Sequence, residues 1–293
     1  NKDEISVLSL NTNYVSQIGM APIKKGGNLW VSECKDLHPL CFENLHRYIF
    51  DGYTDGRGVP RQNVTFLQDV SHKLFPVLLE NESRVNYSYN GYRFFIAQGK
   101  DMPANVTSTD PVRRKPGRAG AATIISESLL QDGPITFTSG DLSEFGHLKE
   151  PRDGPKSKFK RAFSVVSTDK YTFVNLHGPH YQDYTNLQES TAAANWIEQI
   201  DEHTSAQHKR GNFTFIGGDF NTGFPNSKHV VEFNGQKLHR THNWNTCCME
   251  NEKNASTGEY ALPFRSDYIL TNRNMTYSSV GTTSRLAKNV KTL

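Results

Sequence analysis

Short runs of apolar residues, each closed by polar residues, recur along the chain. Eight of these runs predict β-strands, because β-branched and aromatic side chains either fill them or alternate with small polar ones. The predicted strands cover residues 5–10, 64–67, 92–97, 121–125, 162–166, 171–176, 213–216 and 267–270. Between the last two of them the pattern is irregular.

Apolar residues at helical spacing predict fewer helices than strands. The clearest helix covers about 187–200, and its apolar positions are Leu187, Ala193, Ala194, Trp196, Ile197 and Ile200. Shorter helices are predicted near 42–49 and 74–78. Two basic stretches, ending at Arg118 and at Arg161, are expected to be exposed loops. Without a repeat or a dividing linker, residues 1–293 predict a single layered α/β domain.

Composition narrows the classes of function. The formal net charge is only +3, which argues against a surface coated for nucleic acid but not against a local basic groove. No apolar run approaches the length of a membrane span. Asn-X-Ser/Thr sequons are somewhat more frequent than composition predicts, which favours a secreted or lumenal protein; an Asn- and Thr-rich chain without glycans is the alternative. The sequons lie at Asn63, Asn81, Asn86, Asn105, Asn212, Asn254 and Asn274.

The stretch from Phe213 to Asn221 places two polar side chains at the end of a predicted core strand. Gly217 and Gly218 are expected to break this strand, and Gly218 would let the backbone turn sharply. Asp219 follows at once, and a carboxylate beside an amide can orient a water next to a phosphorus atom. An ordinary turn is the alternative, because Gly, Asp and Asn are the usual turn residues.

Polar residues stand at the ends of five of the predicted strands, so one cleft at a sheet edge could gather them. They are Asn11, Asp69, His177, the pair Asp219 and Asn221, and Asp267. Carboxylate and amide oxygens are hard ligands that suit Mg²⁺. Such a metal can neutralise a phosphoryl oxygen and help to deprotonate water, while histidine and basic groups can stabilise developing charge.

Five short motifs in order along the chain resemble those of the endonuclease/exonuclease/phosphatase superfamily, which has the DNase I-like fold. They are Leu10-Asn11-Thr12-Asn13, Phe66-Leu67-Gln68-Asp69-Val70, Leu176-His177-Gly178-Pro179, Gly218-Asp219-Phe220-Asn221 and Arg265-Ser266-Asp267-Tyr268-Ile269-Leu270. The resemblance covers nearly the whole chain. It implies an α/β sandwich of two mixed β-sheets flanked by helices.

The resemblance also implies roles for individual residues. His177 would contact the scissile phosphate, Asp219 would position or activate the attacking water, and Asn221 would orient the phosphate. Asn11 and Asp69 would hold Mg²⁺ or Mn²⁺. The reaction implied is metal-dependent hydrolysis of a phosphoester.

Two departures from the family pattern concern the catalytic groups. Asp69 stands where the family has a glutamate that is the main metal ligand, so its side chain is one methylene shorter. Asp267 would support the metal or a catalytic histidine, but the Ser-Asp-His triplet that ends family sequences does not follow it. Either the chain is cut before a final strand that carries this triplet, or the triplet has been lost. Without that histidine the rate would fall by about 10² to 10⁴.

The basic stretches and the third motif favour a nuclease acting on DNA or RNA. Arg118, Arg161 and His180 are predicted to contact this nucleic acid. Two alternatives stay open: a catalytically impaired fold kept as a binding or structural protein, and a phosphodiesterase for lipid or sugar phosphates. The sequence leaves the oligomeric state open.

Overall fold

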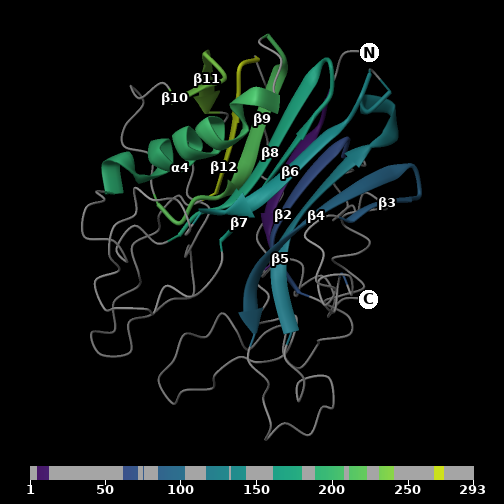
Figure 1. The fold of residues 1–293 in the computed structure, drawn as a ribbon, viewed down its shortest axis with the longest axis horizontal. Coiled ribbons are helices and arrows are strands. Elements are labelled where there is room, and N and C mark those ends of the chain that lie inside the picture. Colours follow the sequence, from purple (N-terminus) through teal and green to yellow (C-terminus); the bar gives the residue numbers. More distant parts are fainter. Residues whose placement is uncertain are drawn as a thin grey trace, which may run out of the picture.

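The computed structural model describes residues 5–12, 62–71, 75, 85–102, 117–131, 133–142, 161–179, 189–207, 211–222, 231–240 and 267–273. Within these ranges the chain forms two β-sheets with one α-helix against the larger sheet (Figure 1). The predicted helices at 42–49 and 74–78, except Phe75, lie outside the described residues, and so does most of the two basic stretches. None of the described helices is long and apolar enough to cross a membrane.

The smaller sheet has five strands in the order β1-β2-β5-β4-β3. Their bounds are β1 Val7–Asn11, β2 Val64–Ser71, β3 Val85–Tyr89, β4 Tyr92–Met102 and β5 Gly117–Ser126. β1 and β2 run parallel, and the other neighbours are antiparallel. The sheet is therefore mixed, as predicted.

The larger sheet has seven strands in the order β10-β11-β12-β9-β8-β7-β6. Their bounds are β6 Thr136–Asp141, β7 Ala162–Ser167, β8 Tyr171–His177, β9 Phe213–Asp219, β10 Val231–Phe233, β11 Gln236–Arg240 and β12 Asp267–Thr271. Only β8 and β9 are parallel neighbours. The prediction of a layered sandwich of two mixed sheets is confirmed.

The core between the sheets is built from alternate residues of facing strands. Phe66 and Phe95 of the smaller sheet meet Phe173 and Phe215 of the larger one in one buried cluster. Phe173 and Phe215 stack with their ring centroids 5.8 Å apart. Since side chains alternate across a strand, every second residue of β2, β8 and β9 points into this interface.

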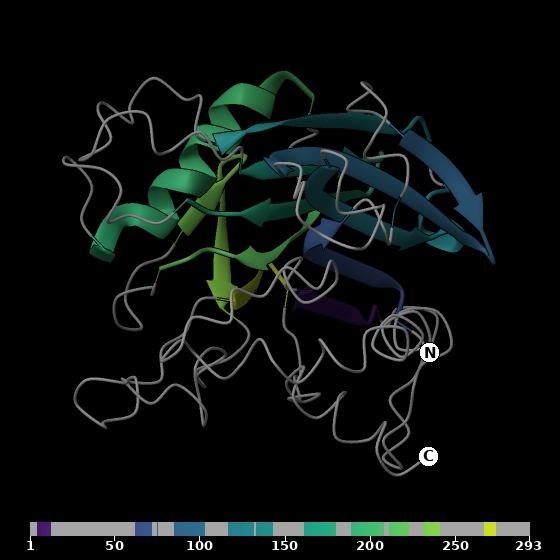
Figure 2. The same ribbon diagram turned by 90° about the horizontal axis from the view of Figure 1, so that it is seen from below.

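The helix α4 (Glu189–Thr204) covers the other face of the larger sheet (Figures 1 and 2). Trp196, Ile197 and Ile200 are buried against that face, as the helical spacing predicts. Ala194 is exposed, so its assignment to the buried face was wrong, and Ala192 takes that place. Two 3₁₀ turns, Glu127–Leu129 and Ser205–Gln207, complete the described helical structure.

The prediction that glycines end the central strand was wrong. β9 continues through Gly217 and Gly218 to Asp219. A Cβ on Gly217 would lie 2.2 Å from Cδ2 of Phe66 in the facing sheet, and one on Gly218 would lie 2.0 Å from the backbone oxygen of Leu176. The glycines therefore allow close packing at this point instead of a turn.

Asp201 near the end of α4 is a carboxylate whose pH response can be predicted. Its Oδ2 accepts a 2.8 Å hydrogen bond from the backbone N–H of Asn234 in the β10–β11 turn. Burial raises the pKa of Asp201 above its ordinary value of 3.8; the bond from Asn234 opposes this rise and neighbouring Glu202 adds to it.

The raised pKa of Asp201 predicts a pH-dependent difference between the wild type and Asp201→Asn. The folded chain keeps this proton to higher pH than the unfolded chain, so ionisation costs folding stability as the pH rises. We expect the unfolding free energy of Asp201→Asn to gain on that of the wild type between about pH 3 and about pH 7. Urea unfolding at both pH values measures this; a constant difference would contradict it.

Asn212 is a sequon that the folded chain cannot offer to a glycan. It is only 4% exposed. Its Nδ2, the atom that would carry the sugar, donates to the backbone oxygen of Thr168 at 3.0 Å and to Oγ1 of Thr172 at 3.2 Å. After expression through a secretory pathway, we expect peptide mass spectrometry to find Asn212 unmodified. A glycan on Asn212 in correctly folded protein would contradict this arrangement.

Candidate functional site

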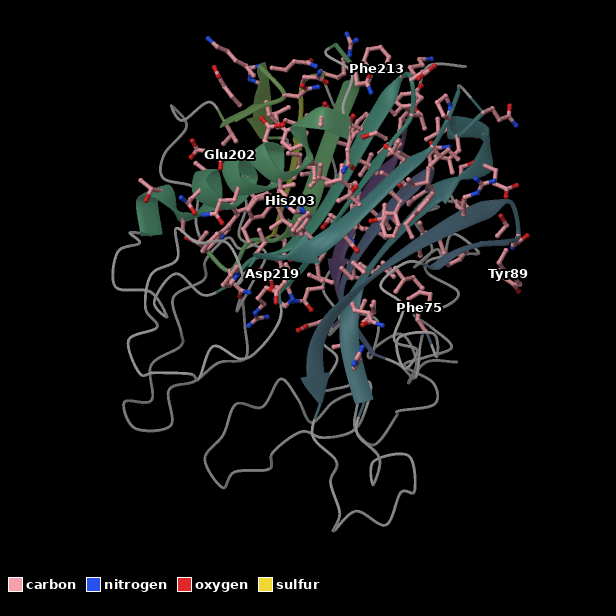
Figure 3. The ribbon with its side chains drawn as sticks, in the orientation of Figure 1. Phe75, Tyr89, Glu202, His203, Phe213 and Asp219 are labelled. Carbon is pink, nitrogen blue, oxygen red and sulfur yellow. The ribbon has the colours of Figure 1, made fainter. Side chains whose placement is uncertain are left out.

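The predicted polar residues meet at one end of the interface between the two sheets. Asn11, His177 and Asp219 are the last residues of β1, β8 and β9, and Asp267 is the first of β12. β1 packs against β9 and β12 of the other sheet. Figure 3 shows Asp219 at the opposite end of β9 from Phe213. The site thus continues the apolar core toward the surface.

Asp219 is held by two amide donors from different elements. Its Oδ2 accepts a 2.7 Å hydrogen bond from Nδ2 of Asn11, across the two sheets. Its Oδ1 accepts a 2.8 Å bond from the backbone N–H of Asn221, which has a φ of 50°. Nδ2 of Asn221 donates to the backbone oxygen of Gly178 at 2.7 Å. The Asp219–Asn221 segment is therefore a turn, as the simpler interpretation held, and this turn fixes Asp219 beside Asn11 and Asn221 beside Gly178.

His177 lies between a carboxylate and a guanidinium. Its Nδ1 is 3.3 Å from Oδ1 of Asp69, and its Nε2 is 2.8 Å from Nη1 of Arg161. An arginine N–H can only donate. Nε2 is therefore the acceptor, and Nδ1 carries the proton that faces Asp69. His177 is 6% exposed, so both neighbours restrict its ring.

The register of the strands brings His177 and Asp267 beside Asp219. His177 pairs with Asp219 between the parallel strands β8 and β9. Asp267 pairs with Asp219 on the other side, between β9 and β12. Side chains of paired residues point to the same face of a sheet. The carboxylates of Asp219 and Asp267 and the imidazole of His177 therefore share the inner face of the larger sheet.

Asp69 sits on a bulge of β2. The register between β2 and β5 shifts between Leu67 and Val70, and Asp69 has a φ of 52°. This left-handed conformation is more accessible to aspartate than to most side chains, because its short polar group can bond locally. The conformation gives a structural reason for aspartate at the position where the resembling family has glutamate.

Of the three residues predicted to contact substrate, the structure places one in the site. Arg161 lies in the site, and its backbone N–H donates to Oδ1 of Asp141 at 2.8 Å. Asp141 is 9% exposed and was not predicted; it ends β6, a strand that the polar sequence hides. Arg118 was expected in an exposed loop, but it lies half-buried in β5 and donates to Gln98 of β4, because the β4–β5 hairpin extends this far. His180 lies outside the described residues.

The oxygen donors of the site suit Mg²⁺, although they do not form a complete cage of protein ligands. Among the described residues, no three His, Cys, Asp or Glu side chains are close enough to hold a metal ion. Mg²⁺ usually needs only one or two carboxylates, since it keeps several waters and binds substrate phosphate. Asp69, whose side chain is 15% exposed, and Asn11 come from the neighbouring parallel strands β2 and β1. These are the residues that would hold the ion.

No protein-family model and no curated protein matches the sequence. Solved structures resemble it at low identity. A truncated TDP2 from Caenorhabditis elegans is 13% identical, with 92% of this chain and 84% of that chain covered at a TM-score of 0.45. The human Nocturnin catalytic domain is 13% identical, with 92% of this chain and 83% of that chain covered at a TM-score of 0.44. A mannosyl-6-phosphatase of Bacteroides thetaiotaomicron is 13% identical, with 92% of this chain and 85% of that chain covered at a TM-score of 0.46. Similarity this low carries no argument about the reaction, which has to come from the site.

Proposed function

We propose that the chain is a divalent-metal-dependent phosphodiesterase of the endonuclease/exonuclease/phosphatase superfamily, and that its substrate is DNA or RNA. The observation that carries this proposal is the convergence of Asp219, held by Asn11 and the Asn221 turn, with His177 between Asp69 and Arg161. Apart from Arg161, these residues come from four of the five motifs that resemble the superfamily. Their order in the sequence and their meeting at one end of the sandwich are independent observations.

Each side chain has a task that its geometry supports. Asp219 can accept a proton from an attacking water, and its two amide donors keep it in place for that contact. The guanidinium of Arg161, held against Nε2 of His177, offers donors for the non-bridging oxygens of a phosphate, where charge grows in the transition state. A bound Mg²⁺ would supply Lewis-acid stabilisation of the phosphoryl oxygens. Together these groups suit in-line attack of water on phosphorus.

The preference for nucleic acid rests on Arg161 and on the basic run that precedes it in the sequence. Arg161 ends a run with three lysines, Lys156, Lys158 and Lys160, and its guanidinium contacts His177. A polyanion drawn to such a run binds more weakly as the salt concentration rises, because counterions compete for the phosphates. A single sugar phosphate would show a much smaller dependence.

A substrate panel tests the class of reaction. We expect a single-stranded DNA or RNA oligonucleotide to be cleaved with Mg²⁺ or Mn²⁺, and p-nitrophenyl phosphate, a monoester, to be left intact under the same conditions. The oligonucleotide reaction should slow as NaCl increases. Hydrolysis of the monoester alone, or cleavage that persists in a chelator, would contradict the proposal.

A binding or structural role is the second candidate, and the shorter carboxylate of Asp69, at the position where the superfamily has glutamate, favours it. Calorimetry separates the two functions. Titration of Mg²⁺ and then Mn²⁺ into the wild type should give a binding signal that Asp69→Asn weakens. No metal binding at any concentration would favour the binding protein over the enzyme.

A further inference from the structure

Asn175 is a fully buried amide in the middle of an apolar strand. It lies on β8 in the run Phe173-Val174-Asn175-Leu176 and is 0% exposed. A buried amide without hydrogen-bond partners costs folding stability, so buried amides are normally bonded. The partners of the Asn175 side chain therefore indicate its structural role. None of these bonds goes to a residue of its own sheet.

Within the described residues, all hydrogen-bond partners of the Asn175 side chain belong to the facing sheet. Nδ2 donates to the backbone oxygen of Leu67 at 3.1 Å and to that of Ala122 at 3.0 Å. Oδ1 accepts a 2.8 Å bond from Nε2 of Gln68, which is also 0% exposed. Leu67 and Ala122 are the last paired residues of β2 and β5 before the register shift. Asn175 therefore binds the beginning of the bulge that carries Asp69.

Thr12, which directly follows the neighbouring strand β1, binds the same bulge. Its backbone N–H donates to the oxygen of Gln68 at 2.9 Å, and its Oγ1 lies 3.0 Å and 3.1 Å from the oxygens of Gln68 and Asp69. A φ of 52° at Asp69 is a sparsely populated conformation, which persists where the surroundings hold it. Asn175 and Thr12 supply that hold from two directions.

The position of Asn175 in its own strand links the bulge to the histidine. Asn175 and His177 are two residues apart on β8, so both side chains point to the inner face. The strand that presents His177 thus also grips the segment that presents Asp69. We propose that Asn175, acting through Leu67 and Gln68, is the positioning residue that sets Asp69 against His177. The inference rests on the proposed function only for the consequence on rate.

The first measurement is independent of activity. In protein labelled with ¹⁵N-histidine, the ring resonances of His177, assigned with a His177→Gln variant, report its contact with Asp69 at one fixed pH. Asn175→Leu removes the side-chain amide and keeps a similar side-chain volume. Gln68→Met removes only the bond between Gln68 and Asn175. This milder variant serves as the test if Asn175→Leu does not fold. We expect both to move the ring resonances in the direction that Asp69→Asn moves them.

Thr123→Val is the matched control. The side chains of Thr123 and Ser164 form another buried hydrogen bond between the two sheets, 2.9 Å long. Neither of these side chains bonds to Asn175 or Gln68. This variant also loses a buried inter-sheet bond, and we expect the His177 resonances to stay at their wild-type positions. Unchanged resonances in Asn175→Leu and Gln68→Met, or equal movement in Thr123→Val, would overturn the proposal.

The second measurement is the rate of phosphodiester hydrolysis. A displacement of a catalytic group by about 1 Å can cost about 10²-fold, so we expect kcat to fall by about that factor in Asn175→Leu while KM changes little. In an Asp69→Asn background the same substitution should cost little more, because the displaced group is already absent. Full additivity of the two losses would overturn the positioning role. A wild type without any hydrolysis would instead refute the proposed function, and the ring resonances would still decide this inference.

Discussion

Asp219→Asn is expected to lower the rate of phosphodiester hydrolysis by about 10³-fold, the middle of the range for losing general acid–base help. The substitution keeps the shape of the side chain but replaces one carboxylate oxygen by an amide group. In the wild type both carboxylate oxygens of Asp219 accept hydrogen bonds, one from Nδ2 of Asn11 and one from the backbone N–H of Asn221. The variant can keep only one of these bonds, and it has no basic oxygen for water.

Stability has to be measured beside the rate, because a lost hydrogen bond also weakens the fold by about 1 to 2 kcal/mol. Asp201→Asn is the matched control: it makes the same chemical change at a carboxylate that contacts the β10–β11 turn and not the site. We expect it to hydrolyse substrate at the wild-type rate. A rate for Asp219→Asn within a factor of a few of the wild type would remove Asp219 from the mechanism.

Gly217→Ala is expected to destabilise the fold by about 3 kcal/mol, near the upper end for overpacking a core. The added Cβ would meet the ring of Phe66 at 2.2 Å from Cδ2, 2.9 Å from Cε2 and 3.0 Å from Cγ. Phe66 is 0% exposed and lies in the cluster between the sheets, so its ring has no room to move away. The change in midpoint of chemical unfolding measures this effect.

A double-mutant cycle with Phe66→Leu separates steric conflict from the intrinsic preference of glycine. If the conflict with the ring is the cause, the double variant should be less destabilised than the sum of the two single variants. Additive losses would show that the contact with Phe66 does not explain why glycine occupies position 217.

The strands that line the core could be predicted from the sequence because their burial shows in their composition. β2, β8 and β9 are runs of apolar side chains, and each was predicted within a few residues. β6 has a single large apolar residue, Phe137, and lies at a sheet edge, so periodicity does not reveal it. The hairpins β3–β4 and β10–β11 could have been found from their Asn-Gly turns, whose asparagines Asn90 and Asn234 have a φ of 52°.

Long-range contacts explain what the sequence could not predict. Gly217 and Gly218 were expected to break β9, because glycine favours turns when only its local sequence is considered. The close approach of Phe66 to Gly217 is a tertiary contact, which the local sequence does not show. The motif order pointed to Asn11, Asp69, His177 and Asp219. The role of Asn175 was not visible, because its partner Leu67 lies 108 residues away in the chain.

The most direct test of the central claim is the conversion of supercoiled DNA by the wild-type chain with Mg²⁺, then with Mn²⁺, and then with either metal plus a chelator. The proposed function predicts nicked or linear product that requires the metal and disappears in Asp219→Asn. Supercoiled DNA and single-stranded RNA that both stay intact in both metals would contradict it.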